Sequence, residues 1–195
     1  MATRHWLKRA REYAPERDRE GGRIRREFTG ADLSGADLSG VDLAGAILDG
    51  ANLMGAKLWK AKLSSASLFG ANLMGANLGS ATLYNAYLNG AQISGANLSD
   101  ARLEGASLSS AKLISADLRN AYLRHAYLVG ADLTGATLEG ADLTQADLSF
   151  AVLICANLIN ADLSGADLTE SNLVRADLVG ATTTGATWVD GSIHD

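Results

Sequence analysis

The sequence predicts an all-β solenoid, a chain that bends once in every short repeat and stacks its bends into a continuous coil. A five-residue period runs without insertion from Arg26 to Asp195, which is 170 residues or 34 units. The middle residue of the unit is Leu in 29 of these 34 units, and the first residue is Ala in 30 of them. A period this regular over most of the chain indicates a repeat architecture.

A five-residue period excludes both common alternatives. In a helix each successive Leu would rotate by about 140° around the axis, so that the Leu side chains would form no stripe. In one long strand side chains alternate with period two, and every second Leu would face the wrong side. A chain that bends once per unit satisfies the pattern.

Each position of the unit has a predicted role. Ala and Leu lie two residues apart and point inward from a short extended piece. The fourth and fifth residues form the corner, where Ser, Thr, Asn and Gly are common turn residues, and the fifth is Gly in 17 units. The second residue is Asp or Asn in 16 units. We expect these side chains to hydrogen-bond nearby backbone at the corners, as Asx residues do.

These units closely resemble the pentapeptide-repeat family, whose tandem pattern is A-(D/N)-L-x-x. The resemblance implies a right-handed quadrilateral β-helix with four units per coil, here about eight coils in residues 26–195. At about 4.8 Å per coil the rod would be about 40 Å long. With four units per coil, Asn52 would stack on Asn72 and Asn77 on Asn97 as short amide ladders.

Charge pairs do not decide the number of sides. A spacing of twenty residues, as in a four-sided coil, places several opposite charges together. A spacing of fifteen, as in a triangular coil, gives about as many such pairs. The opposite pairs at twenty are Asp37/Lys57, Asp42/Lys62, Glu104/Arg124, Lys112/Asp132 and Arg119/Glu139. The four-sided coil therefore rests on the resemblance.

Both ends of such a coil need covers, because an open backbone edge invites further stacking. Residues 1–25 form a basic lead-in in which Trp6, Leu7, Ala10 and Tyr13 have the spacing of a short amphipathic helix before Pro15. We expect this helix to cap the first coil; the alternative is a disordered basic arm. The stretch 13–22 resembles the lead-in of some cyanobacterial members. At the other end, Trp188 stands at an inward position and would plug the last coil.

No catalytic, cofactor or metal site is predicted. His5, His125 and His194 are far apart, and Cys155 stands alone without a His or Lys in register. Ser is abundant at corners, where it is a turn residue, and no His–Asp pair accompanies it. We therefore predict a protein that is not an enzyme and holds no cofactor.

The outer surface remains as the candidate site. Tyr, Trp and Arg commonly anchor interfaces, and contiguous exposed apolar residues suggest a contact surface. The alternative is a tolerant β-surface whose side chains pair along ladders. The candidate partner-binding residues are Trp59, Met54, Met74, Tyr84, Tyr87, Arg102, Tyr122 and Tyr127.

Charge is uneven along the chain. Residues 1–26 have nine bases and four acids, whereas residues 131–195 have ten acids and one base. Some pentapeptide-repeat proteins resemble duplex DNA in shape and charge and occupy the DNA-binding saddle of type II topoisomerases. Here only the C-terminal third approaches the charge density of DNA. Its candidate acidic surface contains Asp132, Glu139, Asp142, Asp147, Asp162, Asp167 and Asp177.

The functional hypothesis is a rigid rod that binds an unknown protein partner as an interaction or scaffold module. The alternative is a DNA-mimicking inhibitor or protector of gyrase acting through the acidic third. Direct nucleic-acid binding is not expected, since the rod has no basic stripe. Leu63 to Ser99 carries no charge but contains many amides, so no membrane span is predicted. We expect a cytoplasmic protein, with end-to-end or side-to-side self-association as a further option.

Overall fold

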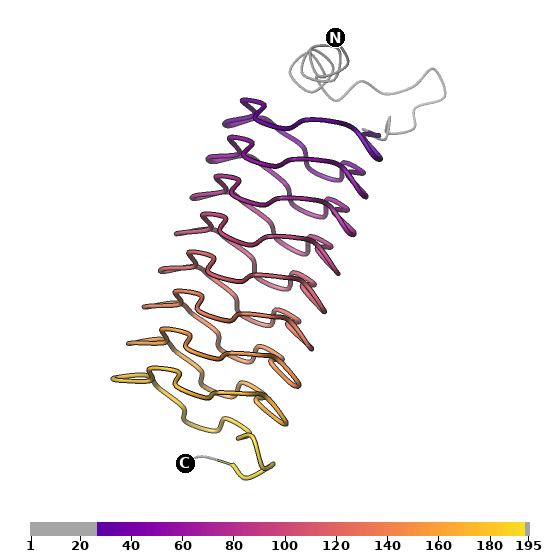
Figure 1. Ribbon diagram of the computed structural model, residues 1–195. Coiled ribbons are helices and arrows are strands. Elements are labelled where there is room, and N and C mark those ends of the chain that lie inside the picture. Colours follow the sequence, from indigo (N-terminus) through magenta and orange to yellow (C-terminus); the bar gives the residue numbers. More distant parts are fainter. Residues whose placement is uncertain (1–26, 194–195) are drawn as a thin grey trace.

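The protein is a rod of stacked four-sided coils, and its computed structural model describes residues 27–193 (Figure 1). The β-structure consists of single-residue parallel bridges, each joining a second-position residue to the residue twenty positions later. These bridges run from Glu27↔Ile47 to Asp167↔Thr187 without a change of register. Four units therefore complete one coil, as expected. The N-terminal cap predicted for residues 1–25 lies outside the described residues.

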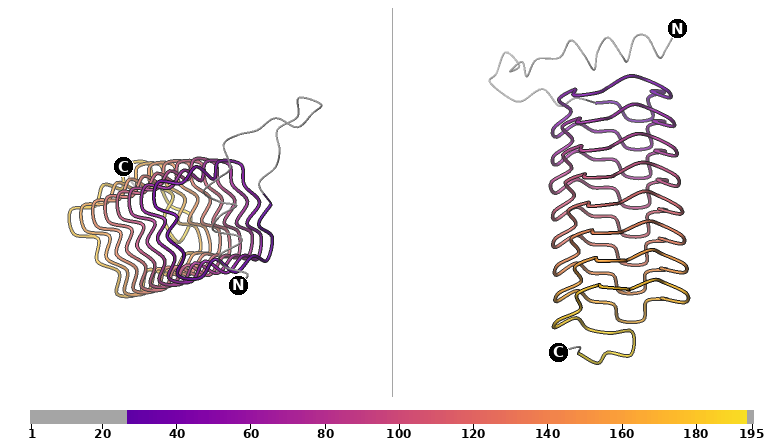
Figure 2. Two further views of the ribbon diagram at one scale, coloured as in Figure 1. Left: turned by 90° about the horizontal axis from the view of Figure 1, so that it is seen from above. Right: turned by 90° about the vertical axis from the view of Figure 1, so that its left-hand side faces the viewer.

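The coils stack in chain order along one axis (Figure 2). Each stack of bridged residues marks one side of the rod, and we call the sides A to D in the order in which the chain visits them. Side A includes Ile47, Ser67, Tyr87, Ser107 and Tyr127; side B Asn52, Asn72, Gln92 and Lys112; side C Lys57, Asn77, Asn97 and Asp117; side D Lys62, Thr82, Arg102 and Tyr122.

Backbone hydrogen bonds follow the same register. The Leu33 N–H donates to the Asn52 carbonyl at 2.8 Å, and the Asn52 N–H donates back to the Ala31 carbonyl at 2.9 Å. The corner is closed within the unit, because the Ala36 N–H donates to the Leu33 carbonyl at 3.0 Å. Each coil is thus bonded to the next on every side, which leaves no lateral sheet edge.

The corners require a left-handed residue at the fifth position. Gly105 has φ +67°, but Lys60 and Phe150 adopt φ 55° and 59° at equivalent corners. Such a φ is typical of the third residue of a type II turn and is unfavourable for a bulky side chain. The fold therefore accepts local strain wherever the sequence departs from Gly.

The core is a column of leucines and alanines inside the rod. Leu33 to Leu168 and the first-position alanines between them are buried, mostly to full exclusion from water. The inward assignment of both positions is thus confirmed. No helix among residues 27–193 is long and apolar enough to cross a membrane.

The C-terminal end departs from the register. Thr187 forms an antiparallel bridge with Ile193, and the Trp188 N–H donates to the Ser192 carbonyl at 2.6 Å. The chain therefore turns back on itself after the last parallel bridge. Trp188 is partly buried against the core, at the inward place predicted for it. Leu173 and Leu178, in the final coil, are only half-buried.

Candidate functional site

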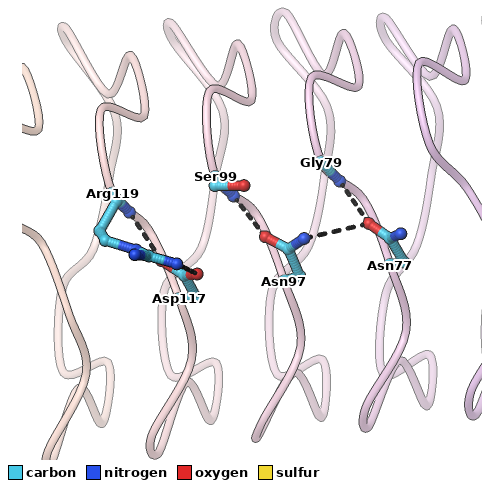
Figure 3. A network of polar contacts seen from close by, with 6 residues as sticks. All are labelled: Asn77, Gly79, Asn97, Ser99, Asp117 and Arg119. Atoms are coloured by element: carbon cyan, nitrogen blue, oxygen red, sulfur yellow. Dashed lines mark hydrogen bonds and ion pairs between the residues drawn. The ribbon is translucent and has the colours of Figure 1, made fainter.

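The second-position carboxylates and amides have a structural role. In each case shown in Figure 3 the side-chain oxygen accepts the N–H of the residue two positions later. The Ser99 N–H donates to Asn97 Oδ1 at 2.9 Å and the Arg119 N–H donates to Asp117 Oδ1 at 3.1 Å. The amide ladders also form, since Asn97 Nδ2 donates to Asn77 Oδ1 at 3.2 Å. These residues support the corners.

Units without Asp or Asn at the second position are therefore the ones that can present other chemistry. On side D, Arg102 occupies such a position between two tyrosines. Its guanidinium lies 4.8 Å from the ring centre of Tyr84 and 5.7 Å from that of Tyr122. We call Tyr84, Arg102 and Tyr122 the side D cluster. The register explains it, because residues 18 and 20 positions apart are neighbours on adjacent coils.

Two acidic side chains lie beside the side D cluster. Arg102 Nη2 lies 3.3 Å from Glu104 Oε1, and Arg124 Nε lies 3.4 Å from Asp142 Oδ2. The other carboxylate oxygen of Glu104 is buried and has no hydrogen-bond partner within the described part of the chain. The guanidinium of Arg102 is thus held in place by two rings and one carboxylate on an otherwise exposed surface.

The other predicted contact residues lie on different sides. Met54 and Met74 are exposed on side B, and Trp59 on side C has the Lys60 ammonium 4.3 Å from its ring centre. Tyr87 and Tyr127 lie on side A, two coils apart. Three of the eight predicted residues thus form the side D cluster, and Met54 and Met74 are neighbours on adjacent coils of side B. Trp59, Tyr87 and Tyr127 stand apart from both groups.

Sequence reasoning missed two exposed aromatic residues. Phe69 and Phe150 are 62% and 54% exposed, and both belong to side A with Tyr87 and Tyr127. Phe150 had a signal in the sequence, since it occupies a corner position where Gly is most common. Phe69 had no such signal, because only the four-sided register shows that it lies in the coil before that of Tyr87.

The predicted acidic surface is divided among all four sides. Two like-charged pairs are bridged neighbours, Asp142 with Asp162 on side D and Asp147 with Asp167 on side A. Asp132 is on side B, and Asp177 and Glu139 are on side C. One oxygen of each bridged aspartate accepts a corner N–H, as when Ser164 N–H donates to Asp162 Oδ1 at 2.9 Å. The second oxygen of Asp142 pairs with Arg124, so these aspartates are only in part available to a partner.

The charge pairs differ in part from those predicted at a spacing of twenty. Lys112 Nζ lies 3.5 Å from Asp132 Oδ2, as predicted. Arg119, however, lies 2.6 Å from Asp117 in its own unit, and Arg124 pairs with Asp142 rather than Glu104. A long side chain reaches along its own strand or diagonally across coils as easily as straight up the stack. All these pairs are at the surface, so each stabilises the fold only slightly.

Asp117, Asp132 and Asp162 have a lowered pKa. The Arg119 side-chain hydrogen bond lowers the pKa of Asp117, and the Ser164 hydroxyl and N–H lower that of Asp162. Burial raises the pKa of Asp132, but hydrogen bonds from Thr134 and the charge of Lys112 outweigh it and the net pKa is lowered. In each case the folded state favours the ionised carboxylate.

This predicts a loss of stability in acid. A carboxyl whose folded pKa lies below its unfolded value of about 4 stabilises the protein above that pH, and the stabilisation is lost as pH falls through the folded pKa. We expect the urea midpoint to be nearly constant from about pH 8 to pH 5 and to fall below about pH 4. The triple variant Asp117→Asn, Asp132→Asn, Asp162→Asn keeps an oxygen for each corner and should show a smaller fall. An equal fall in both proteins would contradict this assignment.

The remaining titratable groups of the described residues form no recognisable centre. Cys155 is an exposed free thiol at a corner with φ 56°. Within residues 27–193 no group of three or more His, Cys, Asp or Glu side chains is placed to hold a metal ion.

The comparisons with known proteins identify the family. The sequence model of the family described as pentapeptide repeats matches the chain, with eight copies. The matched residues are 27–59, 61–100, 71–109, 101–140, 111–149 and 146–185. The chain belongs to the pentapeptide-repeat family. Pentapeptide-repeat proteins form right-handed quadrilateral β-helices, and the bridges at a spacing of twenty agree with that fold.

Solved structures of pentapeptide-repeat proteins are similar to the chain. A trypsin-treated variant of QnrB1, a plasmid-mediated fluoroquinolone resistance protein, is 23% identical, with 81% of this chain and 84% of that one covered at a TM-score of 0.68. HetL, involved in heterocyst differentiation regulation in the cyanobacterium Nostoc, is 34% identical over 87% of this chain and 92% of its own, at a TM-score of 0.26. No curated protein sequence matches the chain significantly.

Proposed function

We propose that this pentapeptide-repeat protein is a rigid, non-enzymatic interaction rod that binds a protein partner through the side D cluster. The observation that carries the proposal is the position of Arg102 between Tyr84 and Tyr122, at 4.8 and 5.7 Å from the two ring centres. Arg and Tyr are enriched among the residues that dominate binding energy. A side chain already held by its neighbours loses less conformational entropy on binding.

The register of the rod supports this use. The cluster lies in the middle coils, where every coil is hydrogen-bonded to the coils on both sides. Its rings project from bridged positions or the adjacent corner, so their spacing is set by the backbone. A partner that binds here meets a preformed surface, which is the condition for affinity without a large contact area.

Partner capture by the variant Tyr84→Ala/Tyr122→Ala tests this proposal. We expect the protein that wild type retains from a cell lysate at moderate salt to be lost by this variant. Binding should weaken at least about thirtyfold, since truncation of even one hot-spot residue costs about 2 kcal/mol or more. The control Met54→Ala/Met74→Ala removes a similar exposed area from side B and should retain the partner. Equal capture by wild type and the tyrosine variant would refute the proposed site.

A DNA mimic directed at a type II topoisomerase is the second candidate, and the bridged pairs Asp142/Asp162 and Asp147/Asp167 favour it. These pairs place four carboxylates on the adjacent sides D and A of the C-terminal third. In the same capture experiment a mimic would retain a topoisomerase subunit that is lost when salt is raised, because screening weakens charge attraction. That partner would be released by Asp142→Asn/Asp162→Asn and kept by the tyrosine variant.

A further inference from the structure

Side A alternates large and small side chains along its column of bridged residues. Ile47, Ser67, Tyr87, Ser107 and Tyr127 follow one another at successive coils, each bridged to the next. Tyr87 and Tyr127 are both 54% exposed. Because coils are about 4.8 Å apart, the two rings stand about 9.6 Å apart with a serine between them. Each serine marks a recess between two projecting side chains.

One of these recesses is a hollow on the surface of the rod. It has a volume of about 410 Å³ and is lined by Ile47, Asp49, Ser65, Ser67 and Tyr87, with the corner at Gly45 and Ala46. The Ser67 hydroxyl is occupied internally, since it donates to Asp49 Oδ1. The Asp49 carboxylate and the Ser65 hydroxyl also line the hollow, beside Ile47 and Tyr87. A tyrosine, which has an apolar ring and a polar hydroxyl, suits such a mixed lining.

We propose that two copies of this chain pack side A against side A, antiparallel, with the two-fold axis between the coils of Tyr87 and Ser107. Tyr87 of each copy then faces Ser107 of the other. Tyr127 of each copy faces Ser67 of the other and enters the hollow beside it. The projections and recesses of one surface match those of the same surface turned through 180°, as an isologous interface requires.

The rest of side A fits the same alignment. Under this two-fold axis Phe69 faces Val129 of the second copy, and Asn89 faces Ser109. The strained corner residue Phe150 faces the corner at Gly50, which has no side chain. Two facing pairs are mismatched, Ile47 with Asp147 and Glu27 with Asp167. Shifting the alignment by one coil in either direction places a tyrosine against a tyrosine and Ser107 against a serine, which loses the fit.

Charge gives this interface an unusual salt dependence. Among the described residues side A has no Lys or Arg, whereas it carries Glu27, Asp49, Asp147, Asp167, Glu170 and Asp190. In the proposed dimer Glu27 faces Asp167 of the other copy, so added salt strengthens association by screening repulsion. A complex held by charge attraction shows the opposite trend, which separates the dimer from a DNA mimic.

The contact is small. One side is about 10 Å wide and the overlap about 34 Å long, which is less than the roughly 800 Å² per partner of a standard interface. We therefore expect a dissociation constant in the micromolar range or above, and a monomer–dimer equilibrium.

Sedimentation velocity of the full chain over a concentration series tests the proposal. Wild type should show a dimer whose fraction rises with concentration and with added salt.

The double variant Ser67→Arg/Ser107→Arg fills both recesses and should be monomeric. Arg is compatible with this backbone position, as Arg102 shows. The control Thr137→Arg, at an equivalent position on side C, should dimerise like wild type. Monomer at every concentration, or an undiminished dimer in the double variant with an unchanged melting temperature, would overturn the proposal.

Spin-label distances test the alignment by a second, geometric measurement. In a Cys155→Ser background, a label at Ser110→Cys should lie about 11 Å from its counterpart and one at Glu170→Cys about 35 Å, measured between backbones. A parallel dimer would make both distances short. Tyr84→Ala/Tyr122→Ala should dimerise as wild type does, since the side D cluster lies outside side A; loss of partner capture therefore leaves this proposal intact.

Discussion

Replacing Leu103 with alanine should lower the free energy of unfolding by about 2–5 kcal/mol. Leu103 is fully buried in the middle of the rod, and its neighbours in the stack, Leu83 and Leu123, are equally buried. Backbone hydrogen bonds hold the adjacent coils at a fixed spacing. The core can therefore collapse only partly around the lost side chain, and a cavity remains.

Two companion variants separate burial from other effects. Leu178→Ala removes the same atoms from the half-buried final coil and should cost clearly less. Leu103→Asp places a carboxylate in the column without a partner and should prevent folding. Urea unfolding followed by circular dichroism measures the stability of Leu103→Ala and Leu178→Ala, and thermal melting tests Leu103→Asp. A normal melting transition in Leu103→Asp would show that this side chain does not face the core.

Enlarging an inward alanine should be the next most damaging change. Ala106 is fully buried, and Ala86 and Ala126 occupy the same place in the coils on either side. Ala106→Leu would force extra methylene groups into a packed layer, at a cost of about 1–3 kcal/mol or more. The spacing between coils is set by the hydrogen bonds, so the layers cannot move apart to admit a larger side chain.

The same substitution at the C-terminal end is its control. Ala181 is only partly buried in the final coil, so Ala181→Leu should be tolerated with little change in the urea midpoint. Equal destabilisation by Ala106→Leu and Ala181→Leu would contradict this explanation. It would show that crowding between coils is not the reason why the first residue of the unit is Ala.

The candidate site was less accessible to sequence reasoning than the fold. The roles of Asn77 and Asn97 as corner acceptors and ladder residues followed from their position in the unit, and the hydrogen bonds confirm them. The grouping of Tyr84 with Arg102 and Tyr122 depends instead on offsets of 18 and 20 residues, which acquire meaning only once the coil has four sides. Phe69 became a neighbour of Tyr87 for the same reason.

The sequence by itself determined the local rules of this protein. The five-residue period places Ala and Leu inside and the turn outside, because only a chain that bends once per unit keeps every Leu on one side. Tertiary structure alone decided which outward residues meet. The charge pairs at spacings of twenty and fifteen were equally frequent, so side chains did not encode the number of sides. The backbone turn at each corner closes the coil after four units, and bridges and hydrogen bonds then join second-position residues twenty apart.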